Sequence, residues 1–346
     1  MPEQLDNSRL GDALGACDFL VAHLDDHGRY HHPEQWGPEG NLYILRIASV
    51  LLEAWTVSGD NRYLAGARRG LDALAGTQRP DGHWPLGTYG EGIEYDATKK
   101  VKERDREDDA FPWVAGGTAF VLGKYRHGAG DDRYRQITGK CLDALAACLS
   151  TGSGLIDVDL QDWNLCMTRV ECLIGLSCWT DRRPELAPCV DRLADWLEAQ
   201  FAAFDEKTQP FCTVLSSLAL LRVRGFTRTG RLVKEVIDRY LATRSYACEE
   251  VPGGWGHRDT SRGMITTEAN IRGTGALAVL MKSYDLAAGR EGYTATGEYR
   301  RMSAWIDGMK DTDGGYFEFQ KASDMKRRAK GSPGQTIPCI WIFASL

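Results

Sequence analysis

RGLDALAGTQRPDGHW, residues 69–84, is the stretch of this sequence that decides the fold. Its first half has apolar residues at helical spacing, and its second half has the proline and glycine of a tight turn, followed by a tryptophan. We expect Gly82 to adopt a positive φ, because a tight turn out of a helix often requires one. The stretch predicts an amphipathic helix, a glycine turn, and an aromatic residue, Trp84, that packs against a neighbouring helix.

The same pattern recurs along the chain. Each copy has an aromatic or small residue and an aliphatic one near the end of a helix, and most copies have a glycine turn after them. The six copies begin at Phe19, Ala73, Ala144, Trp196, Tyr240 and Trp305. In the first, fifth and sixth turns, we expect Gly28, Gly254 and Gly315 to adopt positive φ. The fourth copy lacks a glycine, so the repeat is irregular there.

A second kind of helix is predicted after each turn. These segments are apolar nearly all round and lie at residues 42–55, 111–123, 166–179, 211–223, 271–284 and 337–346. A helix that is apolar on all sides must be buried on all sides, whereas the helices predicted at 61–78 and 187–201 have a single apolar face. The alternation predicts an all-α fold, an (α/α)6 toroid in which six helical hairpins form a double barrel. We expect one domain, residues 1–346.

The composition limits the partners of the chain. With 43% apolar residues, 26% charged residues and a net charge of −6, it lacks the basic face that nucleic-acid binding requires. No stretch is long and apolar enough to cross a bilayer, and no membrane association is indicated. The ten cysteines form no C-x-x-C pair, so we expect buried thiols. The first residues lack a secretory pattern, which predicts a cytoplasmic location.

The segment from Arg69 to Trp84, with Gln78 and Gly82, resembles the QW repeat of squalene–hopene and oxidosqualene cyclases. Residues 253–256 (GGWG) and 313–316 (DGGY) resemble weaker copies. The β subunits of protein prenyltransferases share the same (α/α)6 fold. The resemblance implies that catalytic side chains lie in one mouth of the toroid, around the N-terminal ends of the inner helices. It also implies a small isoprenoid substrate.

The acidic residues before the third inner helix are the first catalytic candidates. Class II terpenoid cyclases carry Asp-x-Asp-Asp at the start of an inner helix, and Asp157 and Asp159 match its first two acids, with Leu160 in place of the last. The resemblance implies that Asp159 donates the proton. That role needs a carboxylic acid kept protonated by its surroundings. Alternatively, both aspartates are helix caps.

A second acidic group precedes the second inner helix. Asp108 and Asp109 are its candidate catalytic residues, next to Trp113. Adjacent carboxylates would bind Mg²⁺ if the substrate carried a diphosphate. The highly charged run at 99–106 instead favours a solvated loop for the outer part of this segment.

The fifth and first turns supply the remaining candidates. His257 and Glu268 are predicted to be catalytic, with Glu268 in the first turn of the fifth inner helix. Arg272 lies four residues after Glu268, and the pair is interpreted either as a structural ion pair or as a substrate anchor. The predicted substrate-binding residues are Trp36, Trp113, Trp163, Tyr43, Arg272 and Asn270.

The sequence predicts no metal site and no resident cofactor. Protein prenyltransferases hold zinc through an Asp-x-Cys pair, whereas Asp162 and Cys166 are four residues apart here. The phosphate-binding, nucleophile-elbow and HExxH motifs are also absent from the sequence.

Three functions remain open at this level. The main prediction is an atypical class II terpenoid cyclase, an isomerase or lyase of isoprenoid or other natural-product biosynthesis, acting by protonation and carbocation cyclisation. Such a site would be lined by aromatic rings, with Trp36, Trp84, Trp113, Trp163 and Trp341 as contributors. The first alternative is a carbohydrate-active glycoside hydrolase or uronate lyase with two carboxylates. The second alternative is a non-catalytic binding module.

Overall fold

The computed structural model describes residues 7–33, 40–82, 84, 112–150, 163–202, 230–244, 246–256, 268–289, 291–331, 335–336 and 339. Helices dominate this part of the chain, and the predicted all-α class is confirmed. The elements are α1 (Asn7–Ala22), α2 (Asn41–Ser58), α3 (Asn61–Thr77), α4 (Pro112–Ala129), α5 (Arg135–Ser150), α6 (Trp163–Ser177), η2 (Pro184–Leu186), α7 (Ala187–Ala202), α9 (Gly230–Thr243), β1 (Glu268–Asn270), α10 (Ile271–Ala288), α11 (Gly297–Gly308), β2 (Phe319–Lys321) and β3 (Arg327–Arg328). Each described helix is too short or too polar to span a membrane.

The chain divides into two compact units. The first comprises Met1–Phe19, Leu160–Cys166 and Leu197–Leu346, and the second comprises Leu20–Asp159 and Met167–Trp196. The unit boundaries fall inside helices α1, α6 and α7, so no linker separates the units at these points. The single domain that we predicted from the repeat therefore stays a prediction.

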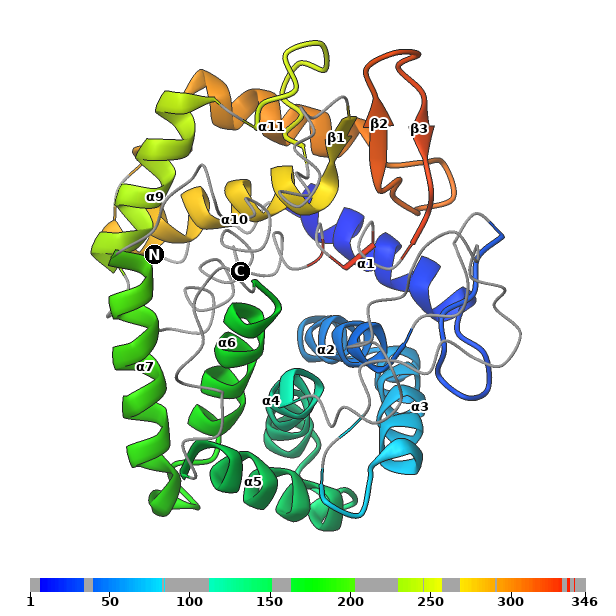
Figure 1. Cartoon of the computed structure of the whole chain (residues 1–346). Coiled ribbons are helices and arrows are strands. Elements are labelled where there is room, and N and C mark those ends of the chain that lie inside the picture. Colours follow the sequence, from blue (N-terminus) through cyan, green and yellow to red (C-terminus); the bar gives the residue numbers. More distant parts are fainter. Residues whose placement is uncertain are drawn as a thin grey trace, which may run out of the picture. The chain divides into compact units, whose positions relative to one another are not determined.

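In the second unit, helices of two kinds alternate. Helix α2 packs against α3 and α4, and α4 packs against α5 (Figure 1). Helix α3 buries one face, through Tyr63, Leu64, Ala67, Leu71 and Leu74. Helix α2 is buried on more sides, because residues at most positions from Ile44 to Leu52 are inaccessible to water. The structure therefore confirms, for α2 and α3, the predicted difference between helices buried on most sides and helices buried on one face.

The first unit repeats this arrangement around α10. Helix α10 packs against α9 and α11, and Leu277, Ala278, Leu280 and Met281 are completely buried in it. The inner helices that we predicted at 42–55, 111–123, 166–179 and 271–284 correspond to α2, α4, α6 and α10. The predicted helix at 211–223, and most of the one at 337–346, lie outside the described residues.

A small antiparallel sheet is the main departure from the predicted pattern. Strands β1, β2 and β3 pair in that order, with Glu268 opposite Lys321 and Phe319 opposite Arg328. The sequence pattern did not predict these strands, because each is only two or three residues long and has no apolar alternation. Strand β1 directly precedes α10 in the chain, and its pairing with β2 fixes the start of that helix.

The glycine turns position the outer helices. In the second turn, Gly82 has φ +89°, and a Cβ on it would lie 2.3 Å from the Lys140 carbonyl oxygen of α5. Gln78 reinforces the same contact, because its Nε2 donates to the carbonyl oxygens of Gly82 and Ile137, both at 3.0 Å. Trp84 closes the turn, fully buried, and its Nε1 donates to the carbonyl oxygen of Leu74 at 2.5 Å. The turn therefore fits only a residue without a side chain.

Three further turns repeat this geometry. In each, a positive-φ glycine lies against the backbone of another outer helix: Gly28 against Arg69 of α3, Gly253 against Arg301 of α11, and Gly314 against Gly15 of α1. In the fifth and sixth turns the positive φ therefore falls one residue earlier than predicted. Gly254 and Gly315 are instead needed for close packing, because a Cβ would lie 2.3 Å from Ala269 Cβ and 2.8 Å from the Phe19 ring, respectively.

The cysteines behave as buried thiols, as predicted. Those that the structure describes are free, and all of them except Cys178 are buried. Cys17 of α1 and Cys339 lie with their Sγ atoms 3.7 Å apart. Burial raises the pKa of the Cys17 thiol well above its ordinary value, so Cys17 is a poor nucleophile at neutral pH.

Substitution of the second-turn glycine tests the turn contact. We expect Gly82→Ala to lower the free energy of unfolding by about 3 kcal/mol or more, because the new methyl group would overlap the Lys140 carbonyl in addition to straining φ. Gly130→Ala is the matched control, since Gly130 has φ +67° with open space around its Cβ position, and should cost only about 1–2 kcal/mol. Urea unfolding of the two variants measures the difference, and equal losses would contradict the role of the contact.

Candidate functional site

The start of helix α10 is the best-defined polar site at an inner-helix N-terminus. Asn270 caps the helix, with its side-chain oxygen accepting a hydrogen bond from the Arg272 N–H at 2.8 Å. Asn270 itself donates its N–H to the Trp255 carbonyl oxygen at 2.9 Å, which ties the helix start to the fifth turn. These bonds hold the helix start, and hence Arg272, in place.

Glu318 lies beside this helix start. The Ile271 N–H donates to the Glu318 carbonyl oxygen at 2.8 Å, and the Glu318 N–H donates to the Ala329 carbonyl oxygen at 2.7 Å. Strand β2, which begins at the next residue, pairs with β1 and continues this connection. The backbone of Glu318 is therefore fixed on both sides, two residues after the aromatic residue of the sixth turn, Tyr316.

The Glu318 carboxyl is chemically unusual. Burial raises its pKa above the ordinary value for glutamate, and the positive charge of Arg272 opposes the increase without cancelling it. A carboxyl with a raised pKa holds its proton to a higher pH than an ordinary glutamate does, and such a group can donate that proton to a substrate and take another back. The adjacent guanidinium can stabilise negative charge on an oxygen of the substrate. Glu318 and Arg272 therefore form a candidate acid–base pair.

The second unit carries another charged pair on its inner helices. Glu171 of α6 is 4% exposed, and its Oε1 lies 3.9 Å from Nη2 of Arg46 on α2. Helices α4 and α6 approach closely here, because a Cβ on Gly116 would lie 2.4 Å from the Cys172 nitrogen. A Cβ on Gly117 would lie 3.3 Å from Glu171 Oε2, so glycine leaves room for the carboxylate. A buried ion pair of this kind is either structural or part of a binding site.

A polar hollow of about 380 Å³ lies at the start of α2. It is lined by Asp26, His27, Arg29, Gly40, Asn41, Ile44, Arg69, Asp72, Ala73, Gly76 and Thr77. Asn41 is 2% exposed, and its Oδ1 accepts a hydrogen bond from Thr77 Oγ1 at 3.3 Å. Carboxylate, amide, hydroxyl and guanidinium groups together suit a ligand rich in hydroxyl groups.

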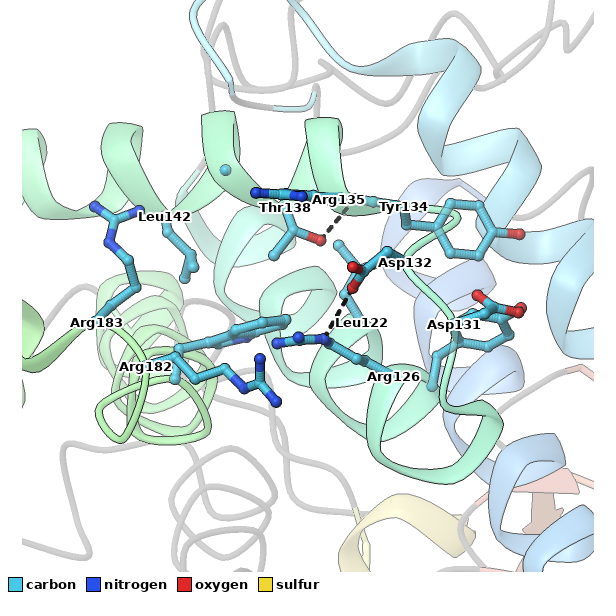
Figure 2. A pocket seen from close by; sticks show the side chains of 13 residues that line it. Leu122, Arg126, Asp131, Asp132, Tyr134, Arg135, Thr138, Leu142, Arg182 and Arg183 are labelled. Atoms are coloured by element: carbon cyan, nitrogen blue, oxygen red, sulfur yellow. Dashed lines mark hydrogen bonds and ion pairs between the residues drawn. The ribbon is translucent and has the colours of Figure 1, made fainter.

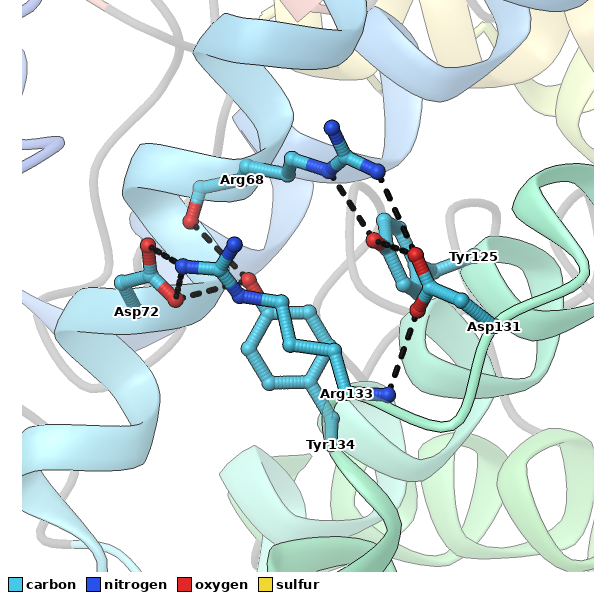
Figure 3. Close-up of polar contacts among 6 residues, drawn as sticks. All are labelled: Arg68, Asp72, Tyr125, Asp131, Arg133 and Tyr134. Atoms are coloured by element: carbon cyan, nitrogen blue, oxygen red, sulfur yellow. Dashed lines mark hydrogen bonds and ion pairs between the residues drawn. The ribbon is translucent and has the colours of Figure 1, made fainter.

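A hydrogen-bonded network holds α3 against the α4–α5 connection (Figure 3). Tyr125 donates its hydroxyl to Asp131 Oδ2 at 2.7 Å and accepts from Arg68 Nε at 2.9 Å. Tyr134 donates to Asp72 Oδ1 at 2.8 Å, and Arg133 Nη2 donates to Asp72 Oδ2 at 2.8 Å. Burial raises the pKa of both tyrosines, and hydrogen bonds to the aspartates add to this increase. The phenols stay protonated and act as structural donors.

The structure describes only some of the predicted site residues. Those outside the described residues are Asp157, Asp159, Asp108, Asp109, His257 and Trp36. Trp113 and Trp163 lie at the starts of α4 and α6, as predicted, but their side chains are not described. Tyr43 lies in the first turn of α2 and is half-buried.

Glu268, Asn270 and Arg272 are brought together at the start of α10, but differently from the predicted helical turn. Glu268 belongs to strand β1, so the four-residue spacing to Arg272 is not a helical one. Asn270, 9% exposed, is the helix cap. The roles predicted for these residues in catalysis and substrate binding stay predictions.

Sequence reasoning missed Glu318 and Glu171. The signal for Glu318 was its position two residues after Tyr316. The residues that follow the fifth and sixth turns are hydrogen-bonded to the start of α10, through Trp255 and Glu318. Glu171 lies inside an apolar segment, where a lone glutamate in a helix predicted to be buried indicates a paired carboxylate. No cluster of three or more metal-ligating side chains occurs among the described residues.

Comparisons with known proteins identify solved structures that share the fold of this chain. No protein-family model matches the sequence, and no curated protein matches it. A solved structure of D-mannose isomerase matches with TM-score 0.70 and 12% identity, covering 100% of both chains. Cellobiose 2-epimerase from Spirochaeta thermophila matches with TM-score 0.65 and 13% identity, over 99% of this chain and 98% of that one. An α-1,6-mannanase of Salegentibacter sp. matches with TM-score 0.57 and 12% identity, over 97% and 98% of the two chains.

Identities this low show the fold alone, and that fold is the predicted (α/α)6 toroid. The same comparisons contradict the main functional prediction, because the matched structures process carbohydrates. The predictions of a terpenoid cyclase, of an isoprenoid substrate and of a role in natural-product biosynthesis are therefore wrong. The resemblance to the QW repeat arose because a buried aromatic after a glycine turn suits the packing of this fold, as in Trp84, and does not specify chemistry. Mg²⁺ was expected only for an isoprenoid diphosphate, so the correction of the substrate removes the reason to expect this ion.

The raised pKa of Glu318 has a measurable effect on stability. Because the folded state holds this proton more tightly than the unfolded chain, stability is highest below ~pH 4.3 and falls as pH rises through the folded pKa. Glu318→Gln removes this penalty, so the variant should be more stable than the parent at pH 7.5 and equal to it at pH 3.5. A difference of one between the pKa values of Glu318 in the folded and unfolded states changes the free energy of unfolding by about 1.4 kcal/mol. Urea unfolding at the two pH values measures the effect, and a variant less stable at pH 7.5 would contradict the assignment.

Proposed function

We propose that this chain is a sugar isomerase or epimerase that moves a proton on an open-chain aldose. The TM-scores of the matched structures support this choice over glycoside hydrolysis. The isomerase and the epimerases align with TM-scores of 0.65 to 0.70, whereas the mannanases align with TM-scores of 0.57 to 0.59.

The observation that carries the proposal is the Glu318 carboxyl, which is bonded through its backbone to the start of α10 and whose pKa is raised by burial and lowered by the charge of Arg272. Isomerisation begins when a base removes the proton on C2 of the aldose, and the C–H electron pair forms a C1–C2 double bond while negative charge moves to O1. A guanidinium stabilises this enediolate oxygen. Return of a proton to C1, with transfer of the O2 hydroxyl proton to O1, gives the ketose, and return of a proton to the opposite face of C2 gives the epimer.

Two carboxyl groups of the first unit are proposed for these transfers. Glu318, whose pKa is raised by burial, is proposed to give a proton to the sugar, and Glu268 of β1 is proposed as the second carboxyl. Arg272 follows the Asn270 cap, which holds its backbone N–H, and its positive charge acts on Glu318. No step in this scheme requires a cofactor.

A second candidate function rests on a different pair of acids. The solved inactive α-1,6-mannanase variant, in complex with α-1,6-mannotetrose, has two consecutive aspartates replaced. This chain has the consecutive aspartates Asp108 and Asp109 immediately before α4, an inner helix. If they act as a pair of carboxylates, they would cleave an α-1,6-mannoside with water.

Solvent-proton exchange distinguishes the two candidates. The protein is incubated in D₂O with D-mannose, D-glucose or cellobiose, and the sugars are analysed by NMR for deuterium at C1 and C2 and for the isomeric product. We expect incorporation of deuterium with conversion of at least one sugar. Glu318→Gln should lower kcat by about 10²–10⁴-fold, because it removes a general acid–base group.

The control is Glu250→Gln, which alters an exposed carboxyl of the same unit and should leave turnover unchanged. Absence of exchange with all three sugars would exclude the proposal. Cleavage of α-1,6-mannotetrose, abolished by Asp108→Asn or Asp109→Asn, would establish the second candidate instead.

A further inference from the structure

A hollow of about 370 Å³ lies in the second unit (Figure 2). Its walls come from α4, α5 and the turn that follows α6. The lining residues are Leu122, Tyr125, Arg126, Asp131, Asp132, Tyr134, Arg135, Thr138, Gly139, Leu142, Trp179, Arg182 and Arg183. A volume of this size is within the range of small-molecule sites.

The floor of the hollow is rigid. Trp179 is 7% exposed, and its Nε1 donates to the Ala119 carbonyl oxygen at 2.9 Å. Leu122 and Leu142 are each 2% exposed. The Arg126 guanidinium lies 5.7 Å from the centroid of the Trp179 ring, and its Nε donates to Asp132 Oδ1 at 3.2 Å. The contacts keep the apolar floor and one guanidinium in fixed positions.

The charges in the hollow do not balance. Arg183 is paired with Asp143 at 2.9 Å and with Glu185, and Arg126 is paired with Asp132. Arg135 and Arg182 have no acidic partner in the part of the chain that the structure describes, although both line the hollow. Four guanidinium groups from three elements therefore surround one hollow, and two of them are uncompensated (Figure 2).

We infer that this hollow binds the phosphate group of a small molecule. Arginine matches phosphate oxygens with a planar fork of N–H donors, and such charge-assisted hydrogen bonds are stronger than neutral ones. A phosphate dianion would offset the excess charge of Arg135 and Arg182, and the Trp179 floor would lie under the rest of the ligand. The ligand is either free inorganic phosphate or a phosphoryl ester such as a sugar phosphate. The site does not depend on the proposed isomerase activity.

Isothermal titration calorimetry with the full chain tests this site. Sodium phosphate is titrated into the protein at pH 7.5, against sodium chloride at the same ionic strength, and we expect saturable binding of phosphate only. Arg135→Gln and Arg182→Gln should each weaken phosphate binding about tenfold or more, because each removes a charge-assisted hydrogen bond. Arg62→Gln is the control, since Arg62 is an exposed arginine of the same unit outside the hollow, and should bind phosphate as the parent does.

A second titration identifies the source of the phosphate. If D-mannose 6-phosphate binds more tightly than inorganic phosphate and D-mannose does not compete for the hollow, the ligand is a phosphoryl ester. If D-mannose 6-phosphate and inorganic phosphate bind with equal affinity, the ligand is free phosphate. The inference is overturned if the parent binds phosphate no better than chloride. It is also overturned if the double variant Arg135→Gln/Arg182→Gln, folded by circular dichroism, keeps the affinity of the parent.

Discussion

The structure depends on the contact of a turn glycine with the backbone of another outer helix. Gly82 meets the Lys140 carbonyl of α5, and Gly28, Gly253 and Gly314 make the same contact with α3, α11 and α1. At Gly28, Gly82 and Gly253 the turn lies against the helix at a distance that no Cβ allows, and a Cβ on Gly314 would lie only 3.0 Å from the Gly15 carbonyl oxygen, so successive hairpins have a fixed spacing. The buried aromatics Trp84, Trp255, Tyr30 and Tyr316 then fill the space behind the turns. The inner helices take their positions from this framework.

This framework explains why the fold was easy to predict and the function was not. The pattern from Arg69 to Trp84 encodes packing, and packing is what one sequence reveals through periodicity, glycine and burial. The same pattern suits any enzyme with this fold, so the resemblance to terpenoid cyclases carried no information about the substrate. Function depends on which side chains stand at the inner-helix starts, and a fold supports many such sets.

The candidate site illustrates the limit more closely. Asn270 and Arg272 were predicted because they precede or open an apolar helix, and the structure brings both to the start of α10. Glu318 was missed because its proximity to Arg272 arises from the pairing of β1 with β2, two strands too short to leave a periodic signal. Likewise, Glu171 meets Arg46 only because glycines let α4 and α6 approach closely. Contacts between distant segments decide which charges meet, and local patterns do not record them.

The contact of the sixth turn with α1 has a consequence for cooperativity. In an open array of repeats, the terminal repeats have one neighbour fewer and fray independently. Here Gly314 lies on Gly15, Gly315 on the Phe19 ring, and Cys339 beside Cys17, so the first helix is packed by the last repeat. Loosening of either would expose the apolar surface of the other. The first helix and the last turn should therefore open together, as one segment, and hydrogen exchange in α1 should report on a residue three hundred positions away in the chain.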